Sequence, residues 1–416
     1  MKFLSLAKNS YWSIIDVLVG TGFGFIISIL LARILGPEIF GRYSFLVTVS
    51  SLIVAFSSSG IAIILLREAV KKKRKFTHYL QSTISIFIFY SLPVILVISI
   101  LLYFTIIQDI DFFYSIAFQI GMMFFGLIIL LFINLQRYDL STWFNFFYRI
   151  SFLTILLFMI YILNYSISLK FIFVLNFILL IILFIIGIYT YNVSFQKKIS
   201  INFKYKLYKK YIFISYPVLG AALAEIINLK LDTIMLGILS TNFEVGIYSA
   251  AYNFYLGFIM IPLALTKAYS PTFIEKSKIG FRNSSKLFYL YLFLFLSYSF
   301  LVVIFLGIFS KSLVTIIYTD AYLEAAEIIF YLALALPFIV NNRLVNYSMI
   351  AVGKQKIYMY YTIVGSIINF TVNLYLIPVY GALGAVIATI LTEFIIFLIG
   401  IIFLLNFFKV NKYKSL

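Results

Sequence analysis

The sequence predicts an all-α integral membrane protein, and three observations support this prediction. Hydrophobic residues make up 64% of the chain and charged residues 11%, and the mean hydropathy is +1.10. Because a membrane-spanning helix needs roughly 20 apolar residues, the long apolar runs correspond to about twelve such helices. The basic residues lie almost wholly in every second gap between these runs. This composition excludes a water-soluble globular domain.

The apolar runs place the predicted membrane spans in two sets of six. The first set covers residues 12–33, 43–66, 82–107, 112–135, 143–163 and 170–191. The second set covers residues 212–237, 246–269, 287–309, 325–346, 357–377 and 382–407. The gaps between spans are short, so most of the chain lies within the bilayer and function must reside between helices.

The distribution of positive charge predicts the orientation of the chain. With a cytoplasmic amino terminus, all but six of the 32 Lys and Arg residues fall on the cytoplasmic side; the exceptions are Arg33, Arg42, Arg149, Lys170, Lys230 and Lys311. Short loops follow this positive-inside bias strongly, so both termini are expected to be cytoplasmic. The net charge of +18 is therefore interpreted as topology and contact with anionic lipid heads, not as nucleic-acid binding.

The sequence divides into two halves that share a short similar segment. A basic cytoplasmic linker, residues 193–211, separates an N-terminal lobe of six helices (1–192) from a C-terminal lobe of six helices (212–416). The residues Gly41-Arg42-Tyr43-Ser44 align with Gly246-Ile247-Tyr248-Ser249 about 205 residues later. A repeat of six spans keeps its orientation, so the halves are expected to be related by a pseudo-twofold axis along the membrane normal and to enclose a central cavity.

Several kinds of chemistry lack the residues they need. The chain has no cysteine and a single histidine, His78, which is predicted to lie in a cytoplasmic loop. Disulfides, haem, zinc and Cys or His nucleophiles are therefore excluded. Asp109 and Asp111 form a D-I-D, but no soluble domain stands beside them to hold a nucleotide-sugar and a metal, so we interpret this as a chance match. We predict neither an enzyme nor a bound cofactor.

Charged residues inside the predicted spans are the candidate functional residues. A charge at the bilayer centre costs about 2.5–3.5 kcal/mol, so each should face protein or water. The candidate cations for an anionic substrate are Arg149, Lys230 and Arg343, and the candidate coupling or cavity acids are Asp16, Glu225, Asp232 and Glu393. The acids would either balance the cations or bind a coupling proton or sodium ion. The alternative is that these groups form interhelical contacts that only hold the bundle together.

Other polar and small residues are interpreted structurally. Asn145 with Arg149, and Asn369 with Asn373, are spaced to meet on one helix face, and for the asparagine pair a structural role is favoured. Gly20, Gly22 and Gly24 lie inside the first span, where they predict close helix packing or local bending.

Several segments resemble the Wzx-type polysaccharide-biosynthesis flippases of the multidrug/oligosaccharidyl-lipid/polysaccharide (MOP) exporter superfamily. The first half contributes ARILGPEIFGRYS (Ala32 to Ser44) and SGIAIILLREAV (Ser59 to Val70). The second half contributes LDTIMLG (Leu231 to Gly237), VGIYSAAYNF (Val245 to Phe254), SPTF (Ser270 to Phe273) and the stretch from Gly353 to Thr389. The segments span the whole chain in the order typical of that family.

The resemblance implies a fold similar to that of the multidrug exporters called MATE, and a function. It implies that undecaprenyl-pyrophosphate-linked oligosaccharide moves from the cytoplasmic to the outer leaflet of the bacterial cytoplasmic (inner) membrane by alternating access. The product would enter the biosynthesis of O-antigen in lipopolysaccharide, capsule or a related surface polysaccharide, with the polymerase and chain-length machinery as candidate partners. Transport would be coupled to H⁺, to Na⁺ or to the membrane potential. The alternatives are an exporter of small amphipathic molecules, a lipid II flippase and a purely structural membrane protein.

Overall fold

The computed structural model describes residues 2–58, 76–195, 213, 229–279 and 281–414, and within these residues every regular element is a helix. The first elements are α1 (Lys2–Ser58), α3 (Phe76–Ile86), η2 (Phe87–Ser91), α4 (Leu92–Leu102), η3 (Tyr103–Ile107), α5 (Asp111–Asn134), α6 (Tyr138–Tyr161) and α7 (Leu169–Phe195). After the helical residues 229–239 come α9 (Asn242–Ile279), α10 (Phe281–Ile317), η4 (Asp320–Tyr322), α11 (Ala325–Ala351) and α12 (Gln355–Lys414). Among the described residues, nine helices are long and apolar enough to cross a membrane. The prediction of an all-α membrane protein is confirmed.

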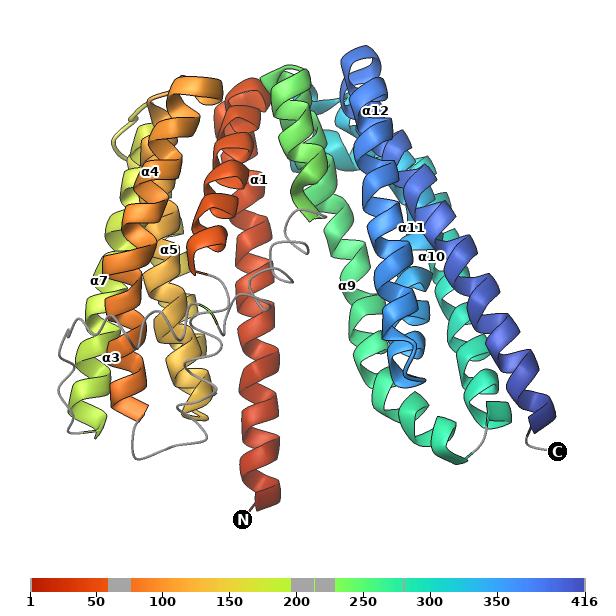
Figure 1. Ribbon diagram of the computed structural model, residues 1–416. Helices are drawn as coiled ribbons and strands as arrows, with labels where there is room; N and C mark the ends of the chain where they lie inside the picture. The colour runs from red at the N-terminus through yellow and green to blue at the C-terminus, as the bar shows by residue number, and fades with distance from the viewer. Residues whose placement is uncertain (1, 59–75, 196–212, 214–228, 280, 415–416) are drawn as a thin grey trace. The chain divides into compact units, whose positions relative to one another are not determined.

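The two longest helices are each broken at a glycine. Gly36 has φ 72° and ψ 168° inside α1, and Gly381 has φ 53° and ψ −130° inside α12. Glycine adopts such angles without the steric cost that a side chain would add. Pro37 directly follows Gly36, where its fixed φ suits the first position of the next helical arm. Each long helix is therefore a hairpin of two apolar arms, which Figure 1 shows for α1 and α12.

The helices follow the predicted spans, but most extend beyond them. The predicted span 246–269 lies inside α9, which ends at Ile279, and the predicted span 287–309 lies inside α10, which ends at Ile317. The prediction for His78 was wrong, because α3 begins at Phe76 and His78 lies in its first turn. The start of the span 212–237 and residues 196–211 of the linker lie outside the described residues. The count of twelve spans and the orientation of the termini therefore stay predictions.

The chain forms two compact units. The first comprises residues 1–27 and 45–230, and the second comprises residues 28–44 and 231–416. In the first unit α5 packs closely against α7: a β-carbon at Gly187 would lie 2.5 Å from the Ile128 side chain, so glycine is needed there. The Tyr148 hydroxyl of α6 donates a 2.6 Å hydrogen bond to Oδ1 of Asn176 in α7.

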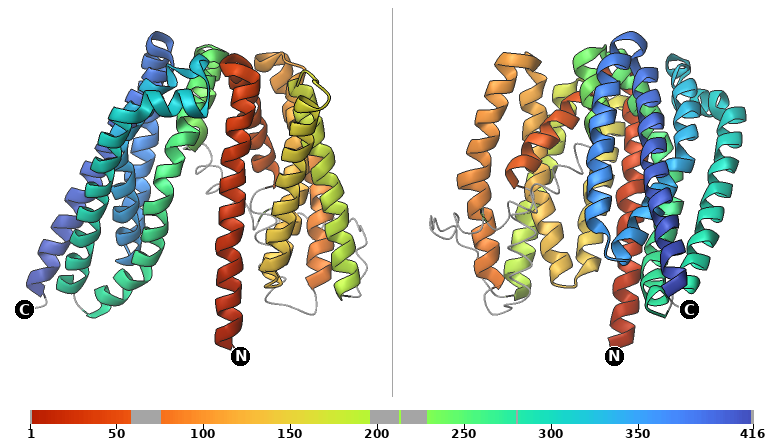
Figure 2. Two further views of the ribbon diagram at one scale, coloured as in Figure 1. Left: turned by 180° about the vertical axis from the view of Figure 1, so that it is seen from behind. Right: turned by 45° about the vertical axis from the view of Figure 1, so that its right-hand side comes forward.

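The second unit is a bundle of α9 to α12, whose helices run side by side in both Figure 1 and Figure 2. The hydroxyls of Tyr269 (α9) and Ser348 (α11) lie 2.6 Å apart in the core. The segment 28–44 joins this unit, since the Tyr322 hydroxyl donates a 2.9 Å hydrogen bond to the carbonyl of Ala32. Buried side-chain hydroxyls thus bond to neighbouring helices, as a bundle in lipid requires.

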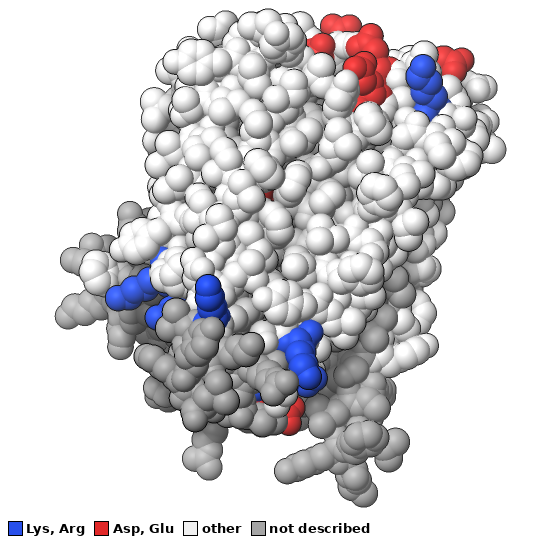
Figure 3. All heavy atoms as spheres, turned by 90° about the vertical axis from the view of Figure 1, so that its right-hand side faces the viewer, with Lys and Arg blue, Asp and Glu red and all other residues white. Residues whose placement is uncertain are grey.

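The surface of the second unit fits a membrane environment. Large apolar side chains are exposed along α10, among them Phe293, Phe300 and Leu301, each more than 60% exposed. On the face in Figure 3, acidic side chains gather at one end and most basic side chains at the other. The α10–α11 connection carries Asp320 and Glu324, and the α11–α12 connection carries Lys354. This separation of charge is typical of helices that end at opposite faces of a bilayer.

Candidate functional site

In the first unit, α1 and α6 hold a small polar cluster within the membrane-spanning region. Nδ2 of Asn145 donates a 2.9 Å hydrogen bond to Oδ1 of Asp16. Arg149 lies one turn beyond Asn145 on α6, and its charge interacts with that of Asp16 without forming an ion pair within 4 Å. The rings of Trp12 and Trp143 also pack against each other between the same two helices. The cluster therefore holds a guanidinium whose charge no described residue cancels through an ion pair.

The guanidinium of Arg149 occupies the space that Gly24 leaves free. A β-carbon at Gly24 would lie 3.0 Å from Nη1 of Arg149, and Nε of Arg149 is buried without a hydrogen-bond partner among the described residues. The prediction of close packing holds for Gly24. At Gly20 and Gly22 no described atom would lie within 4 Å of a β-carbon, so close packing is not seen there and the alternative of local bending stays a prediction.

In the second unit, Asp232 is the centre of a cluster drawn from three helices. Its Oδ2 accepts 2.8 Å hydrogen bonds from the hydroxyls of Tyr248 (α9) and Thr389 (α12). Its Oδ1 accepts a 2.8 Å hydrogen bond from Nδ2 of Asn373, which also contacts Oδ1 of Asn369 at 3.0 Å. Three donors stabilise the charged form of the carboxylate, and no cation pairs with it among the described residues.

The sequence alone did not identify the partners of Asp232. Asn373 was assigned a structural role with Asn369, and their contact is present, but Asn373 also bonds Asp232. Neither Tyr248 nor Thr389 was predicted to contact Asp232. Tyr248 was noted only as part of the repeated G-x-Y-S segment, and Thr389 only as the last residue of a segment that resembles the flippase family. Tyr248, Tyr252 and Tyr255 recur at the spacing of one helix face, which is the signal that points to α9.

Glu393 and Arg343 lie in the same unit as Asp232. Oε2 of Glu393 accepts a 2.6 Å hydrogen bond from Nδ2 of Asn342 on α11. Arg343 follows Asn342 and interacts electrostatically with Glu393, although its buried Nε has no hydrogen-bond partner among the described residues. Glu393 lies one turn beyond Thr389 on α12, so one face of this helix carries both a hydrogen-bond donor to Asp232 and the second acid.

The remaining candidates are placed differently. Lys230 is exposed at the start of the helical residues 229–239, and Glu225 lies outside the described residues. The structure thus brings Asp16 toward Arg149 in one unit and Asp232, Arg343 and Glu393 together in the other.

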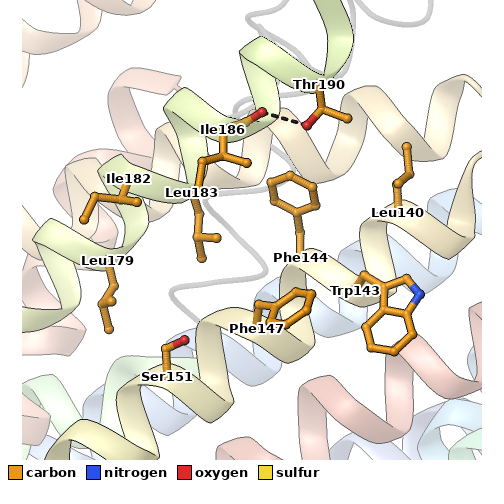
Figure 4. Close-up of a pocket in the computed structure, with 10 residues that line it drawn as sticks. All are labelled: Leu140, Trp143, Phe144, Phe147, Ser151, Leu179, Ile182, Leu183, Ile186 and Thr190. Atoms are coloured by element: carbon orange, nitrogen blue, oxygen red, sulfur yellow. Dashed lines mark hydrogen bonds between the residues drawn. The ribbon is translucent and has the colours of Figure 1, made fainter. Parts of the chain in front are cut away.

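A separate apolar cavity of about 600 Å³ lies between α6 and α7. Figure 4 shows Trp143, Phe144 and Phe147 of α6 facing Ile182, Leu183 and Ile186 of α7, with Ser151 and Thr190 as the polar residues of the lining. The Thr190 hydroxyl is bonded to the carbonyl of Ile186 in its own helix. None of the predicted site residues lines this cavity, whose walls suit hydrocarbon and not a charged group.

The fold is that of MOP superfamily transporters. The chain is similar to "Lipid II flippase MurJ, inward closed conformation", with a TM-score of 0.69 and 16% identity over 95% of this chain and 87% of that one. It is equally similar to an inward-facing MATE multidrug resistance transporter of the MOP superfamily, with a TM-score of 0.69 and 12% identity over 98% of this chain and 100% of that one. A MOP superfamily transporter from Pyrococcus furiosus gives a TM-score of 0.54 at 14% identity, over 96% and 95% of the two chains.

The sequence itself assigns the family. Residues 6–276 match the family described as polysaccharide biosynthesis protein, and the chain belongs to that family. The family and the fold agree with the resemblance of the sequence segments to the Wzx-type flippases. A comparison with curated proteins gave no match.

Proposed function

We propose that this protein is a flippase that moves undecaprenyl-pyrophosphate-linked oligosaccharide from the cytoplasmic to the outer leaflet by alternating access. The family match over residues 6–276 carries the proposal, because it joins polysaccharide biosynthesis to a fold shared with a lipid II flippase. The finished units would enter O-antigen, capsule or a related surface polysaccharide. The protein would act in the cytoplasmic membrane of a bacterium, upstream of the polymerase and chain-length machinery.

Arg149 is the group best suited to the anionic head of such a substrate. A pyrophosphate needs charge-assisted donors, and Arg149 carries a positive charge that no described ion pair neutralises. Lys230 is exposed and Arg343 is half-buried, so both are further candidates for this role. The hydrocarbon tail would stay in the bilayer while the head crosses.

The membrane potential can drive this movement. An inside-negative potential favours outward transfer of an anion by about 2.3 kcal/mol per charge per 100 mV. Two net negative charges would gain about 4.6 kcal/mol at 100 mV if no counter-ion travelled with them. Asp232, with hydroxyl and amide oxygens around it, is the proposed site of a coupling H⁺ or Na⁺.

A deletion strain tests the function. We expect surface polysaccharide to be lost and complete lipid-linked repeat units to accumulate on the cytoplasmic leaflet. Restoration by the wild-type gene assigns the effect to this protein. If units still reach the outer leaflet after related transporters are also removed, while susceptibility to amphipathic drugs rises, the protein is instead an exporter of the multidrug type.

Substitution of a cavity cation tests the mechanism in the same strain. Arg149→Ala should abolish surface polysaccharide without changing the amount of protein in the membrane. Arg137→Ala is the matched control, since Arg137 lies at the start of the same helix in an exposed ion pair with Asp139, and such pairs contribute little. Retained transport by Arg149→Ala would remove Arg149 from the proposed substrate site.

A further inference from the structure

One cluster of described residues within the spans of the second unit carries more negative than positive charge. Asp232 and Glu393 lie within its spans, and Arg343 interacts electrostatically with Glu393. Neither acid forms an ion pair within 4 Å with a described residue. With all three groups ionised, this cluster has one negative charge in excess. Because an uncompensated charge inside the bilayer is costly, the cluster has a place for one monovalent cation.

Hydroxyl groups connect the two acids along two helices. On α12, Thr389 donates to Asp232 at 2.8 Å and lies one turn before Glu393. On α9, Tyr248 donates to Asp232 at 2.8 Å, and the rings of Tyr252 and Tyr255 follow it. The ring centroids of Tyr248 and Tyr252 are 5.8 Å apart, and those of Tyr252 and Tyr255 are 6.1 Å apart.

The row of tyrosines spans the distance between the acids. Tyr252 interacts electrostatically with Asp232, Arg343 and Glu393. Tyr255, one turn further on, interacts with Arg343 and Glu393. The row therefore begins at the hydrogen bond to Asp232 and ends within electrostatic range of Glu393.

Several buried polar atoms on α9 and α12 have no hydrogen-bond partner among the described residues. Tyr255 is 1% exposed, and its buried hydroxyl has no hydrogen-bond partner among the described residues. The Thr392 hydroxyl beside Glu393 and Oδ1 of the fully buried Asn373 beside Asp232 are likewise unpartnered there. Buried polar atoms in native proteins are almost always satisfied by protein, water or an ion, so these oxygens can serve as acceptors for a bound cation.

We propose that Glu393 is a second station for the monovalent cation that Asp232 binds, and that the Tyr248–Tyr252–Tyr255 row leads from one acid to the other. This inference rests on the proposed coupling at Asp232. Asp232 offers a carboxylate, two hydroxyls and an amide oxygen, so it is the tight site. Arg343 repels a cation at Glu393, so Glu393 is the weak site from which the cation leaves. The cation is either a proton or Na⁺.

Binding and release of the cation by the purified protein in lipid nanodiscs test this proposal. Affinity is read from the rise in Tm with NaCl against choline chloride, and with falling pH, because a ligand of the folded state stabilises it. Release is read from ²²Na⁺ washout and from the signal of a pH indicator after a pH jump. The rise in Tm with NaCl and the ²²Na⁺ washout report Na⁺, whereas the rise in Tm with falling pH and the signal of the pH indicator report a proton.

We expect Asp232→Asn to abolish the cation-dependent rise in Tm. Glu393→Gln removes the negative charge in excess, so it should reduce that rise without abolishing it, and it should slow release by about tenfold or more, which corresponds to a barrier about 1.4 kcal/mol higher. Tyr255→Phe should slow release in the same direction. The matched controls are Glu327→Gln and Tyr289→Phe, both exposed on neighbouring helices, and both should release the cation at the wild-type rate.

Two results would overturn the proposal. The first is wild-type release from Glu393→Gln and Tyr255→Phe, both folded as judged by size-exclusion chromatography. The second is a wild-type protein whose Tm responds to neither Na⁺ nor pH.

Lipid translocation measured on the same preparation separates the two claims. Translocation without cation binding refutes the second station and leaves the flippase function standing, whereas cation release without translocation refutes the function alone.

Discussion

Gly41 and Gly246 face each other so closely that neither position has room for a side chain. A β-carbon at Gly41 would lie 1.7 Å from the carbonyl oxygen of Asn242, and one at Gly246 would lie 1.9 Å from the carbonyl oxygen of Pro37. Pro37 precedes Gly41 by one turn, as Asn242 precedes Gly246. The two segments with similar sequences therefore meet through equivalent residues within the second unit, as two segments related by a local pseudo-twofold would.

We predict that Gly41→Ala and Gly246→Ala each lower the Tm of the purified protein. Each added methyl group would overlap a backbone carbonyl that cannot rotate away, so the segment 37–44 must move off α9. Overpacking of this kind typically costs about 1–3 kcal/mol. Gly257→Ala on α9 is the control, because no described atom would lie near its β-carbon, and alanine there should leave the Tm equal or slightly higher. An unchanged Tm in the two variants would contradict the observed contact.

We also predict that Gly24→Val reproduces the transport defect of Arg149→Ala. A valine side chain at Gly24 would displace the guanidinium of Arg149, whose Nη1 already lies at 3.0 Å from the position of a β-carbon. Gly22→Val is the matched control, since that position opens onto free space among the described residues. The double variant Gly24→Val, Arg149→Ala should show no further loss of surface polysaccharide, because both changes remove the same group. An additive loss would mean that Gly24 acts independently of Arg149.

Apolar run length predicted the helices well, because burial in hydrocarbon forces about 20 residues to be apolar and helical. It did not predict how far they continue, since the ends of α9 and α10 leave the apolar region and remain helical. The π-helical turns at Phe87–Ser91 and Tyr103–Ile107 were also missed. Such turns depend on one extra residue per turn, which composition does not record.

The sequence predicted which charges lie in the spans but not which groups meet them. Asn145 was paired with Arg149 by spacing, yet its amide bonds Asp16 of another helix. Thr389 and Tyr248 bond Asp232 from helices far apart in sequence. Helical periodicity defines one face of one helix, whereas these contacts depend on how three helices pack.

The hydroxyl of Thr389 should stabilise the second unit through Asp232. We predict that Thr389→Val, which keeps the shape of the side chain, lowers stability by about 1.5–3 kcal/mol, the usual contribution of a hydrogen bond to a charged group. Thr371→Val on the exposed face of α12 serves as the control and should cost much less. Thermal unfolding of both variants gives the comparison. In an Asp232→Asn background the cost of Thr389→Val should shrink, and an equal cost in both backgrounds would contradict the assigned contact.

Glu244 should act as a cap for the second arm of α12. Its Oε2 accepts a 2.7 Å hydrogen bond from the backbone N–H of Ala382, directly after the break at Gly381, and helix starts leave such N–H groups unsatisfied. Glu244→Ala is therefore expected to lower stability by about 0.5–2 kcal/mol, the range for loss of a helix cap. Glu244→Gln, which keeps an acceptor oxygen, should recover most of this loss.

The matched control for the cap is Glu324→Ala, because Glu324 stands at the start of α11 without a side-chain hydrogen bond to the helix. Thermal unfolding of the three variants, in one detergent and at one protein concentration, measures the differences. Gly381→Ala adds an independent check: its φ of 53° disfavours a side chain, and the new β-carbon would lie 2.5 Å from Cδ of Glu244. If Glu244→Ala and Glu324→Ala unfold at the same temperature, Glu244 does not hold the hairpin of α12 together.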